Sequence, residues 1–413
     1  MVKGLMGRLA AGAAVAAMLA PTLACAAQLD PAQGDGGVPA FYQWTEAVPA
    51  TPGAMLRTEP LPAELVLANA ARGVRILYAS TNGIDGKTPT PVSGALFLPK
   101  GAPPAGGWPL MAWSHGTVGV ADVCAPSFAG RSQRDINYLN HWLAQGYAVV
   151  ASDYQGLGTP GGHPYMASRP AAYSVLDSVR AVQHGDFGLS KEVVIVGQSQ
   201  GGGAAFATAG YASTYAPELD VRGTVATGTP WVTPRIFQAV TAAGRDKPQA
   251  TFGYVLLMLY LIRQTDPSFQ FADYVSDKAM PAVKLGATGC LQGVEEAVVD
   301  DGLTYENSFI KDPTEKLNAV FGLMGYATLA PAAPVFMGTG ALDKDVPPPM
   351  QQALIRSACA AGARIEAHEY EGLDHSGAVN GSLGDSTPFV KKAFAGETIG
   401  GNCADNWATQ PAQ

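Results

Sequence analysis

The sequence predicts an α/β protein with a mostly parallel sheet that is covered by helices on both faces. Short, nearly all-apolar segments recur along the chain, and helical stretches separate the later ones. Strands without polar alternation are typical of a sheet that is buried on both faces. With 413 residues, of which 47% are hydrophobic and 15% are charged, the chain can bury a large core.

The expected elements follow one another along most of the chain. Apolar runs predict strands at residues 74–78, 92–98, 110–114, 148–152, 193–196, 223–227 and 334–337, and an alternating pattern predicts a further strand at 363–370. Helices are expected at residues 135–145, 171–184, 202–212, 349–362 and 387–394. Residues 27–60 are rich in Pro, Gly and Ala and show no clear period, so we expect an irregular arm over the surface.

The alternation of strands and helices breaks between residues 230 and 329. This stretch contains several prolines, few β-branched runs, and helical patches at 251–263, 294–299 and 315–324. We therefore expect a helical cap that is inserted between two strands. The core then consists of two parts, residues 27–229 and residues 330–413.

The first 26 residues predict a secretory signal peptide. A basic start is followed by the apolar run 9–19 and the small-residue site Ala24-Cys25-Ala26, with cleavage expected after Ala26. A membrane anchor is disfavoured because the run is shorter than the roughly 20 residues that a bilayer crossing requires. A lipid-modified Cys25 is a weaker alternative, because Thr22 stands where a lipoprotein signal usually has Leu. We expect a secreted or periplasmic protein.

The cysteines and the net charge bear on the disulfides, metal sites and partners that the protein can have. In an oxidising compartment, the cysteines left after cleavage predict disulfides, with three pairings open. No CxxC or Cys/His cluster occurs, so a zinc site is not expected. A net charge of −8 without a basic stripe argues against a nucleic-acid partner. The four remaining cysteines are Cys124, Cys290, Cys359 and Cys403.

A serine between two glycines is the strongest chemical signal in the chain. The segment from Gly197 to Gly201 reads GQSQG, follows the strand expected at 193–196, and opens into a helix of small residues. This pattern predicts a nucleophile elbow with Ser199 at its tip. So sharp a turn leaves no room for side chains two residues before and after the serine, and both positions are glycine.

A reactive serine needs a base that takes its proton, and in the fold with this elbow the base comes later in the chain. Only His368 and His375 follow Ser199. His368 lies in an alternating strand pattern and is expected to be structural. His375 lies in a polar turn just past that strand, where the catalytic groups of such sheets gather, and we expect it to be the base.

The base in turn needs a carboxylate that orients it. Asp343 follows the strand at 334–337, and the interval to His375 leaves room for one helix and one strand, so Asp343 is our preferred acid. Asp345 is its competitor, and both Lys344 and Asp374 are interpreted as turn residues.

The oxyanion of the reaction needs backbone donors. We expect the amide of Gln200, at the start of a helix, and the amide of Thr117, in the loop after the strand at 110–114. His115 is interpreted as a residue that braces this loop. Asp153 and Tyr154 could line the pocket or brace the neighbouring loop, and bracing is favoured. The apolar patch 252–262 fits either the substrate-facing side of a lid or ordinary packing.

Several motifs together resemble the secretory lipase family, a branch of the α/β-hydrolases. They are His115-Gly116, the DYQGLG segment 153–158, GQSQGG at 197–202, DKDVP at 343–347, and His375, and the resemblance runs from roughly residue 44 to 403. It implies an α/β-hydrolase fold with a helical cap and the triad Ser199, Asp343 and His375. It also implies disulfides Cys124–Cys290 and Cys359–Cys403, the second holding the tail near Trp407. In some members an acidic residue stands at the position of Thr117.

We therefore expect an exported serine esterase or lipase that forms an acyl-enzyme with a small-molecule or lipid ester. This mechanism needs no metal and no organic cofactor, so none is expected. A transient contact with a lipid interface and the oligomeric state stay open. Two other functions are weighed: a secreted serine peptidase of the same fold, and a hydrolase-like binding protein without catalysis.

Overall fold

A nine-stranded sheet forms the centre of the molecule. The computed structural model describes residues 1–2, 29–242 and 244–405, so the expected signal peptide, Cys25 and Trp407 lie outside the described residues. The strand order is β1-β2-β3-β5-β4-β6-β7-β8-β9. β1, β2 and β3 pair antiparallel, β3 also pairs antiparallel with β5, and the other neighbours are parallel. The α/β-hydrolase fold predicted from the sequence is confirmed.

The strands match the expected apolar runs, with one addition. Their bounds are β1 Met55–Pro60, β2 Ala70–Thr81, β3 Pro89–Pro99, β4 Trp108–Ser114, β5 Ala148–Ser152, β6 Leu189–Gln198, β7 Asp220–Thr227, β8 Val335–Gly340 and β9 Ile365–Tyr370. The expectation of a wholly irregular arm at 27–60 is wrong, because β1 lies within it. β1 is an edge strand with no buried residue and ends in a proline, so it carries no apolar run.

Alternate side chains of each strand point to opposite faces of the sheet. Because the strands carry apolar side chains on both faces, helices pack on both. On β4, Met111 and Trp113 pack in the cluster of α2 (Gln133–Ala144) and α13 (Leu383–Phe394). Leu110 and Ala112 instead pack with α3 (Ser168–Gln183) and α4 (Gln200–Tyr215). At the far edge, α11 (Pro348–Ala360) packs on β8 and β9. Two further helices of the core, α1 (Pro126–Ala129) and α12 (Gly377–Gly381), are short.

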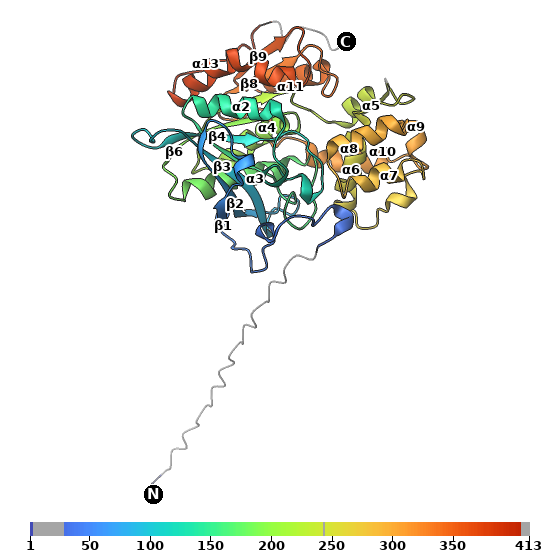
Figure 1. The fold of residues 1–413 in the computed structure, drawn as a ribbon, viewed down its shortest axis with the longest axis horizontal. Coiled ribbons are helices and arrows are strands. Elements are labelled where there is room, and N and C mark those ends of the chain that lie inside the picture. The colour runs from blue at the N-terminus through green and yellow to red at the C-terminus, as the bar shows by residue number, and fades with distance from the viewer. Residues whose placement is uncertain (3–28, 243, 406–413) are drawn as a thin grey trace.

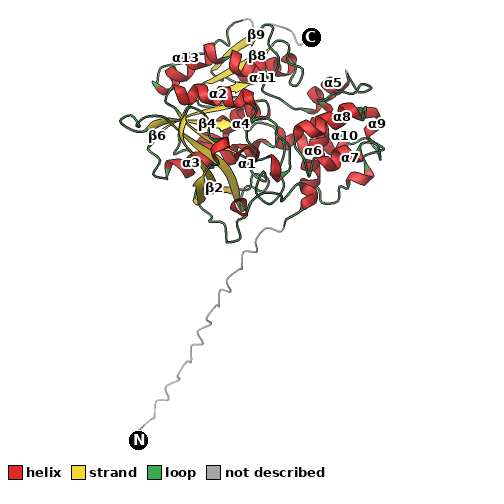
Figure 2. Cartoon of the chain, viewed as in Figure 1, coloured by secondary structure: helices red, strands yellow, loops and turns green. Residues whose placement is uncertain are grey.

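The chain between β7 and β8 forms a helical insertion beside the sheet (Figures 1 and 2). Its helices are α5 Pro234–Ala242, α6 Phe252–Thr265, α7 Met280–Leu285, α8 Leu291–Asp300, α9 Tyr305–Ser308 and α10 Thr314–Met324. α6 is buried along nearly its whole length, in a hydrophobic cluster that it shares with α7, α8 and α10. The same cluster includes Val120, Tyr165 and Ala167, so these helices also pack against loops of the core. No helix in the described ranges is long and apolar enough to span a bilayer.

Two disulfides tie distant parts of the chain together. Cys124–Cys290 joins the short helix at Asp122–Cys124, in the core, to the residue that precedes α8. Cys359–Cys403 joins α11 to the C-terminal segment. Both pairings are those that the family resemblance implies.

Candidate active site

The GQSQG turn joins β6 to α4 and holds Ser199 in a strained conformation. Ser199 has φ 60° and ψ −126°, which is rare for a residue with a side chain. Its backbone N–H donates to the carbonyl of Thr227 at 2.9 Å. A Cβ on Gly197 would lie 2.0 Å from the Gly201 carbonyl oxygen, and a Cβ on Gly201 would lie 2.0 Å from that of Ser114. The turn therefore requires both glycines.

The two loops at the ends of β8 and β9 bring an acid and an imidazole together. His375 Nδ1 lies 2.7 Å from Asp343 Oδ2, and the imidazole is the donor because a carboxylate only accepts. The other carboxylate oxygen, Asp343 Oδ1, accepts the backbone N–H groups of Asp345 at 2.9 Å and Val346 at 2.8 Å. His375 Nε2 is buried and has no hydrogen-bond partner among the described residues. The ring is thus oriented by Asp343, and its second nitrogen is free to accept a proton.

Gly228 brings the imidazole next to the backbone that holds the serine. This residue follows Thr227, the hydrogen-bond partner of the Ser199 N–H, and a Cβ at this glycine would lie 2.7 Å from His375 Cε1. Ser199 and His375 are both buried. No hydrogen bond joins their side chains in the described structure.

The alternative acid and the alternative base lie elsewhere. Asp345 accepts a hydrogen bond from the Tyr254 hydroxyl of α6 at 2.7 Å, and so joins the core to the helical insertion. His368, on β9, pairs with Glu366 at 3.3 Å and stacks on Phe336. The structure brings Asp343, and not Asp345, into hydrogen-bond contact with an imidazole.

The expected oxyanion residues, Gln200 and Thr117, line the same cavity as Ser199. The side chain of Gln200 donates to Nε2 of His163 at 3.0 Å, while the Nδ1–H of that imidazole donates to a backbone carbonyl at 3.0 Å. Burial lowers the pKa of His163 to about 4, so the ring stays neutral and accepts this bond. Sequence reasoning missed His163, because no spacing rule links it to the elbow. The Thr117 hydroxyl shares a hydrogen bond of 2.8 Å with Tyr165.

His115, Asp153 and Tyr154 lie outside the lining of the cavity and hold its loops. The His115 ring stacks on Tyr154 at 4.3 Å between centroids, and the Tyr154 hydroxyl donates to the His115 carbonyl at 2.9 Å. Asp153 accepts the Ser93 hydroxyl at 2.7 Å and the Ser127 backbone N–H at 2.9 Å. These bonds fasten the loops after β4 and β5 to each other.

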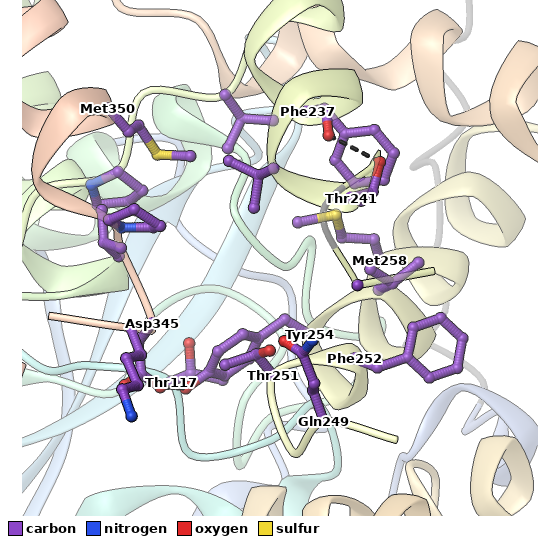
Figure 3. Close-up of a pocket in the computed structure, with 18 of the residues that line it drawn as sticks. Thr117, Phe237, Thr241, Gln249, Thr251, Phe252, Tyr254, Met258, Asp345 and Met350 are labelled. Atoms are coloured by element: carbon purple, nitrogen blue, oxygen red, sulfur yellow. Dashed lines mark hydrogen bonds between the residues drawn. The ribbon is translucent and has the colours of Figure 1, made fainter. Parts of the chain in front are cut away.

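A cavity of about 500 Å³ opens above the serine, between the core and the helical insertion. Figure 3 shows Thr117, Asp345 and Met350 of the core on one side of it. Side chains of the insertion stand on the other side, namely Phe237 and Thr241 of α5 and Phe252 and Met258 of α6. Most of these groups are apolar, so the cavity suits an apolar part of a ligand next to Ser199.

The donor set of this site does not fit a metal ion. Among the described residues, one group of potential ligands comes within 4.8 Å, namely Asp343, Asp345 and His375. Both oxygens of Asp343 already accept two hydrogen bonds each, and one Asp345 oxygen accepts from Tyr254. A hard cation would have to displace donors that satisfy the carboxylates.

The fold and this site define an α/β-hydrolase. The model of one family in this class, described as secretory lipase, matches residues 126–402. Because this match spans more than half of the chain, the chain belongs to the secretory lipase family. It is an ester hydrolase of the lipase and esterase type.

Individual relatives are distant but cover much of the chain. Lipase A of Moesziomyces aphidis is 24% identical over 368 residues, 84% of this chain and 77% of that protein. The X-ray structure of Candida antarctica lipase A superimposes with a TM-score of 0.69 at 21% identity and covers 88% of both chains. A Mycobacterium tuberculosis protein named as a probable inactive lipase is 29% identical over 201 residues, 45% of this chain and 43% of that protein.

Proposed function

We propose that the chain is a serine carboxylic-ester hydrolase whose triad is Ser199, His375 and Asp343. The observation that carries this proposal is the His375–Asp343 hydrogen bond of 2.7 Å, with the free Nε2 beside the strained Ser199 turn. A serine hydroxyl becomes a nucleophile when a neutral imidazole takes its proton, and a buried carboxylate stabilises the imidazolium that forms.

The reaction then has two halves. As Ser199 Oγ attacks the ester carbonyl, its proton passes to His375, which delivers it to the leaving alcohol. The oxyanion of the tetrahedral intermediate is held by the amides of Gln200 and Thr117. Water next attacks the acyl-enzyme with His375 again as the base, and releases the acid and the free serine.

The walls of the cavity indicate the class of substrate. An ester with an apolar acyl or alcohol part fits the side chains of α5 and α6, and a lipid ester is such a substrate. We assign residues 230–329 to a cap that covers this part. The lipase name of the relative from Moesziomyces aphidis supports a lipid ester as well.

The localisation follows from the N-terminus together with the family. The basic and apolar start and the site at Ala26 support export to the outside or the periplasm, in keeping with a family described as secretory. The two disulfides fit an oxidising compartment. N-terminal sequencing of the exported protein tests the cleavage site, and a mature chain that still begins at Met1 would contradict it.

The test is covalent labelling by a fluorophosphonate, which reacts only with an activated serine. The wild type and Ser213→Ala, an exposed serine on α4, should be labelled and should hydrolyse p-nitrophenyl butyrate. Ser199→Ala should lose both. Labelling and turnover that survive in Ser199→Ala would overturn the proposal. An unlabelled wild type would instead support a binding protein, and faster turnover of aminoacyl nitroanilides than of esters would support a peptidase.

A further inference from the structure

A buried glutamine lies directly behind the acid of the proposed triad. Gln351 is in the first turn of α11 and only 1% exposed. Its Nε2 donates to Asp343 Oδ2 at 2.9 Å and to the Val346 carbonyl at 2.7 Å. Its Oε1 accepts the hydroxyl of Thr339, on β8, at 3.0 Å. Both N–H groups and the oxygen of this amide therefore have partners.

These partners allow only one orientation of the amide. A rotated amide would point Oε1 at the Asp343 carboxylate and the Val346 carbonyl, and both of these groups only accept hydrogen bonds. The donor side of Gln351 is thus fixed toward Asp343 Oδ2, the same oxygen that accepts the imidazole N–H of His375.

Gln351 completes a closed set of donors around the carboxylate. Two backbone N–H groups bind Asp343 Oδ1, while Gln351 and His375 bind Oδ2. Without the glutamine, Oδ2 would keep the imidazole alone, and a buried carboxylate would lose one charge-assisted hydrogen bond. Because Thr339 belongs to β8, the amide also connects the carboxylate of Asp343 to the sheet.

We propose that Gln351, held in place by Thr339, is a positioning residue for the hydrolysis. It keeps Asp343 Oδ2 aligned with the imidazole N–H of His375. The side chain lies outside the lining of the cavity, so it acts through Asp343 and not on the substrate. This inference rests on the proposed function, because it takes Asp343 as the acid of the triad.

The test compares the same substitution at two neighbouring positions of α11. Gln351→Met keeps the size of the side chain and removes its hydrogen bonds. Gln352→Met is the matched control, because Gln352 bonds only the exposed Glu369. With p-nitrophenyl butyrate, Gln351→Met should lower kcat about 10-fold to 100-fold, with KM within about twofold of the wild type. Gln352→Met should leave both constants within about twofold of the wild type.

A double variant separates positioning from general damage. If Gln351 acts through Asp343, adding Gln351→Met to Asp343→Asn should lower kcat by less than about twofold more. A further loss as large as that of the single variant would overturn the proposal, and so would a wild-type kcat in folded Gln351→Met. Wild-type activity of Asp343→Asn would overturn the proposed triad instead, so the two failures are distinguishable.

A second pair of variants covers the case in which Gln351→Met does not fold. Thr339→Val removes the hydroxyl with little change of shape, and should lower kcat about 3-fold to 10-fold at unchanged KM. Thr339→Ser keeps the hydroxyl and should restore kcat to within about twofold of the wild type. Equal kcat values for the valine and serine variants would overturn the inference.

Discussion

The carboxyl edge of the sheet and the helical insertion form opposite sides of one cavity, but they are specified differently. At the sheet edge, backbone geometry decides the identity of residues, as it does at Gly197 and Gly201. In the insertion, the apolar side chains of α6 pack as a cluster in which size and burial matter more than identity. We therefore expect the edge to tolerate substitution poorly and the insertion to change specificity before it loses activity.

The largest effect is expected from one methyl group at the sheet edge. In Gly201→Ala, the new Cβ would lie 2.0 Å from the Ser114 carbonyl oxygen, so the elbow has to move. A displacement of this kind should lower kcat/KM by at least about 100-fold. Hydrolysis of p-nitrophenyl butyrate by the purified, folded variant measures this loss.

The matched control is the same substitution in the insertion. Gly322 lies in α10, and a Cβ at this position meets no atom within 4 Å. Gly322→Ala should leave kcat/KM unchanged and stabilise the protein by about 0.5–1 kcal/mol. Equal losses in the two variants would remove the contrast between the two regions.

The disulfides should differ in their contribution to stability. Replacing both Cys124 and Cys290 by Ala opens a loop with a sequence separation of 166 residues, against 44 for Cys359 and Cys403. The first change should lower the free energy of unfolding by about 3–5 kcal/mol, and the second by about 1 kcal/mol less. Urea denaturation of the two double variants measures both values. A larger loss for the 359–403 pair would contradict this dependence on loop length.

A smaller effect is expected from the wall of the insertion. Phe252 lines the cavity from α6, so Phe252→Ala should lower kcat/KM for p-nitrophenyl octanoate about 10-fold. Turnover of the acetate ester should stay within about twofold, because the residues of the proposed triad belong to the core. A uniform loss for both esters would contradict this division of roles.

The smallest effect concerns pH. Burial, together with the charge of Asp345, raises the pKa of Glu295 on α8 to about 7. The pKa of an unfolded glutamate is about 4.3, so the folded state holds this proton more tightly. The stabilisation is complete below about pH 4.3 and is lost as the pH rises toward 7. Glu295→Gln should therefore flatten the fall of Tm between pH 5 and pH 8, and an unchanged slope would contradict this role.

The core contains a second carboxyl group whose pKa is raised. Burial also raises the pKa of Asp122 to about 7, and its carboxylate accepts the Gly36 N–H at 2.7 Å. Asp122→Asn should therefore also reduce the fall of Tm between pH 5 and pH 8, and an unchanged slope in this variant would contradict the role of Asp122.

The difference between the sheet edge and the insertion also determines what could be predicted from the sequence. Parallel strands are local apolar runs, so the fold could be predicted from the sequence, and the sharp turn at Ser199 could be predicted because it is a local motif. His375 and Asp343 could be proposed because the order of groups along such sheets is restricted. The helical patches and the small number of β-branched runs predicted a helical insertion. They did not predict the bounds of α5, α7 and α9.

Other features of the structure, both in the sheet and at the site, left no pattern in the sequence. β1 pairs through its backbone at an exposed edge, so its side chains show no apolar run. His163 and Gln351 meet Gln200 and Asp343 only through tertiary packing. A hydrogen bond between residues that no spacing rule relates becomes apparent only once the chain is folded.

A burst experiment tests the central claim most directly. Mixing the enzyme with excess p-nitrophenyl acetate and stopping the reaction in acid should give one p-nitrophenol per chain in the first turnover, with an acetyl group on Ser199 found by peptide mass spectrometry. His375→Ala should lose the burst. An acyl group on any other residue, or rapid turnover with Ser199 never acylated, would contradict the account.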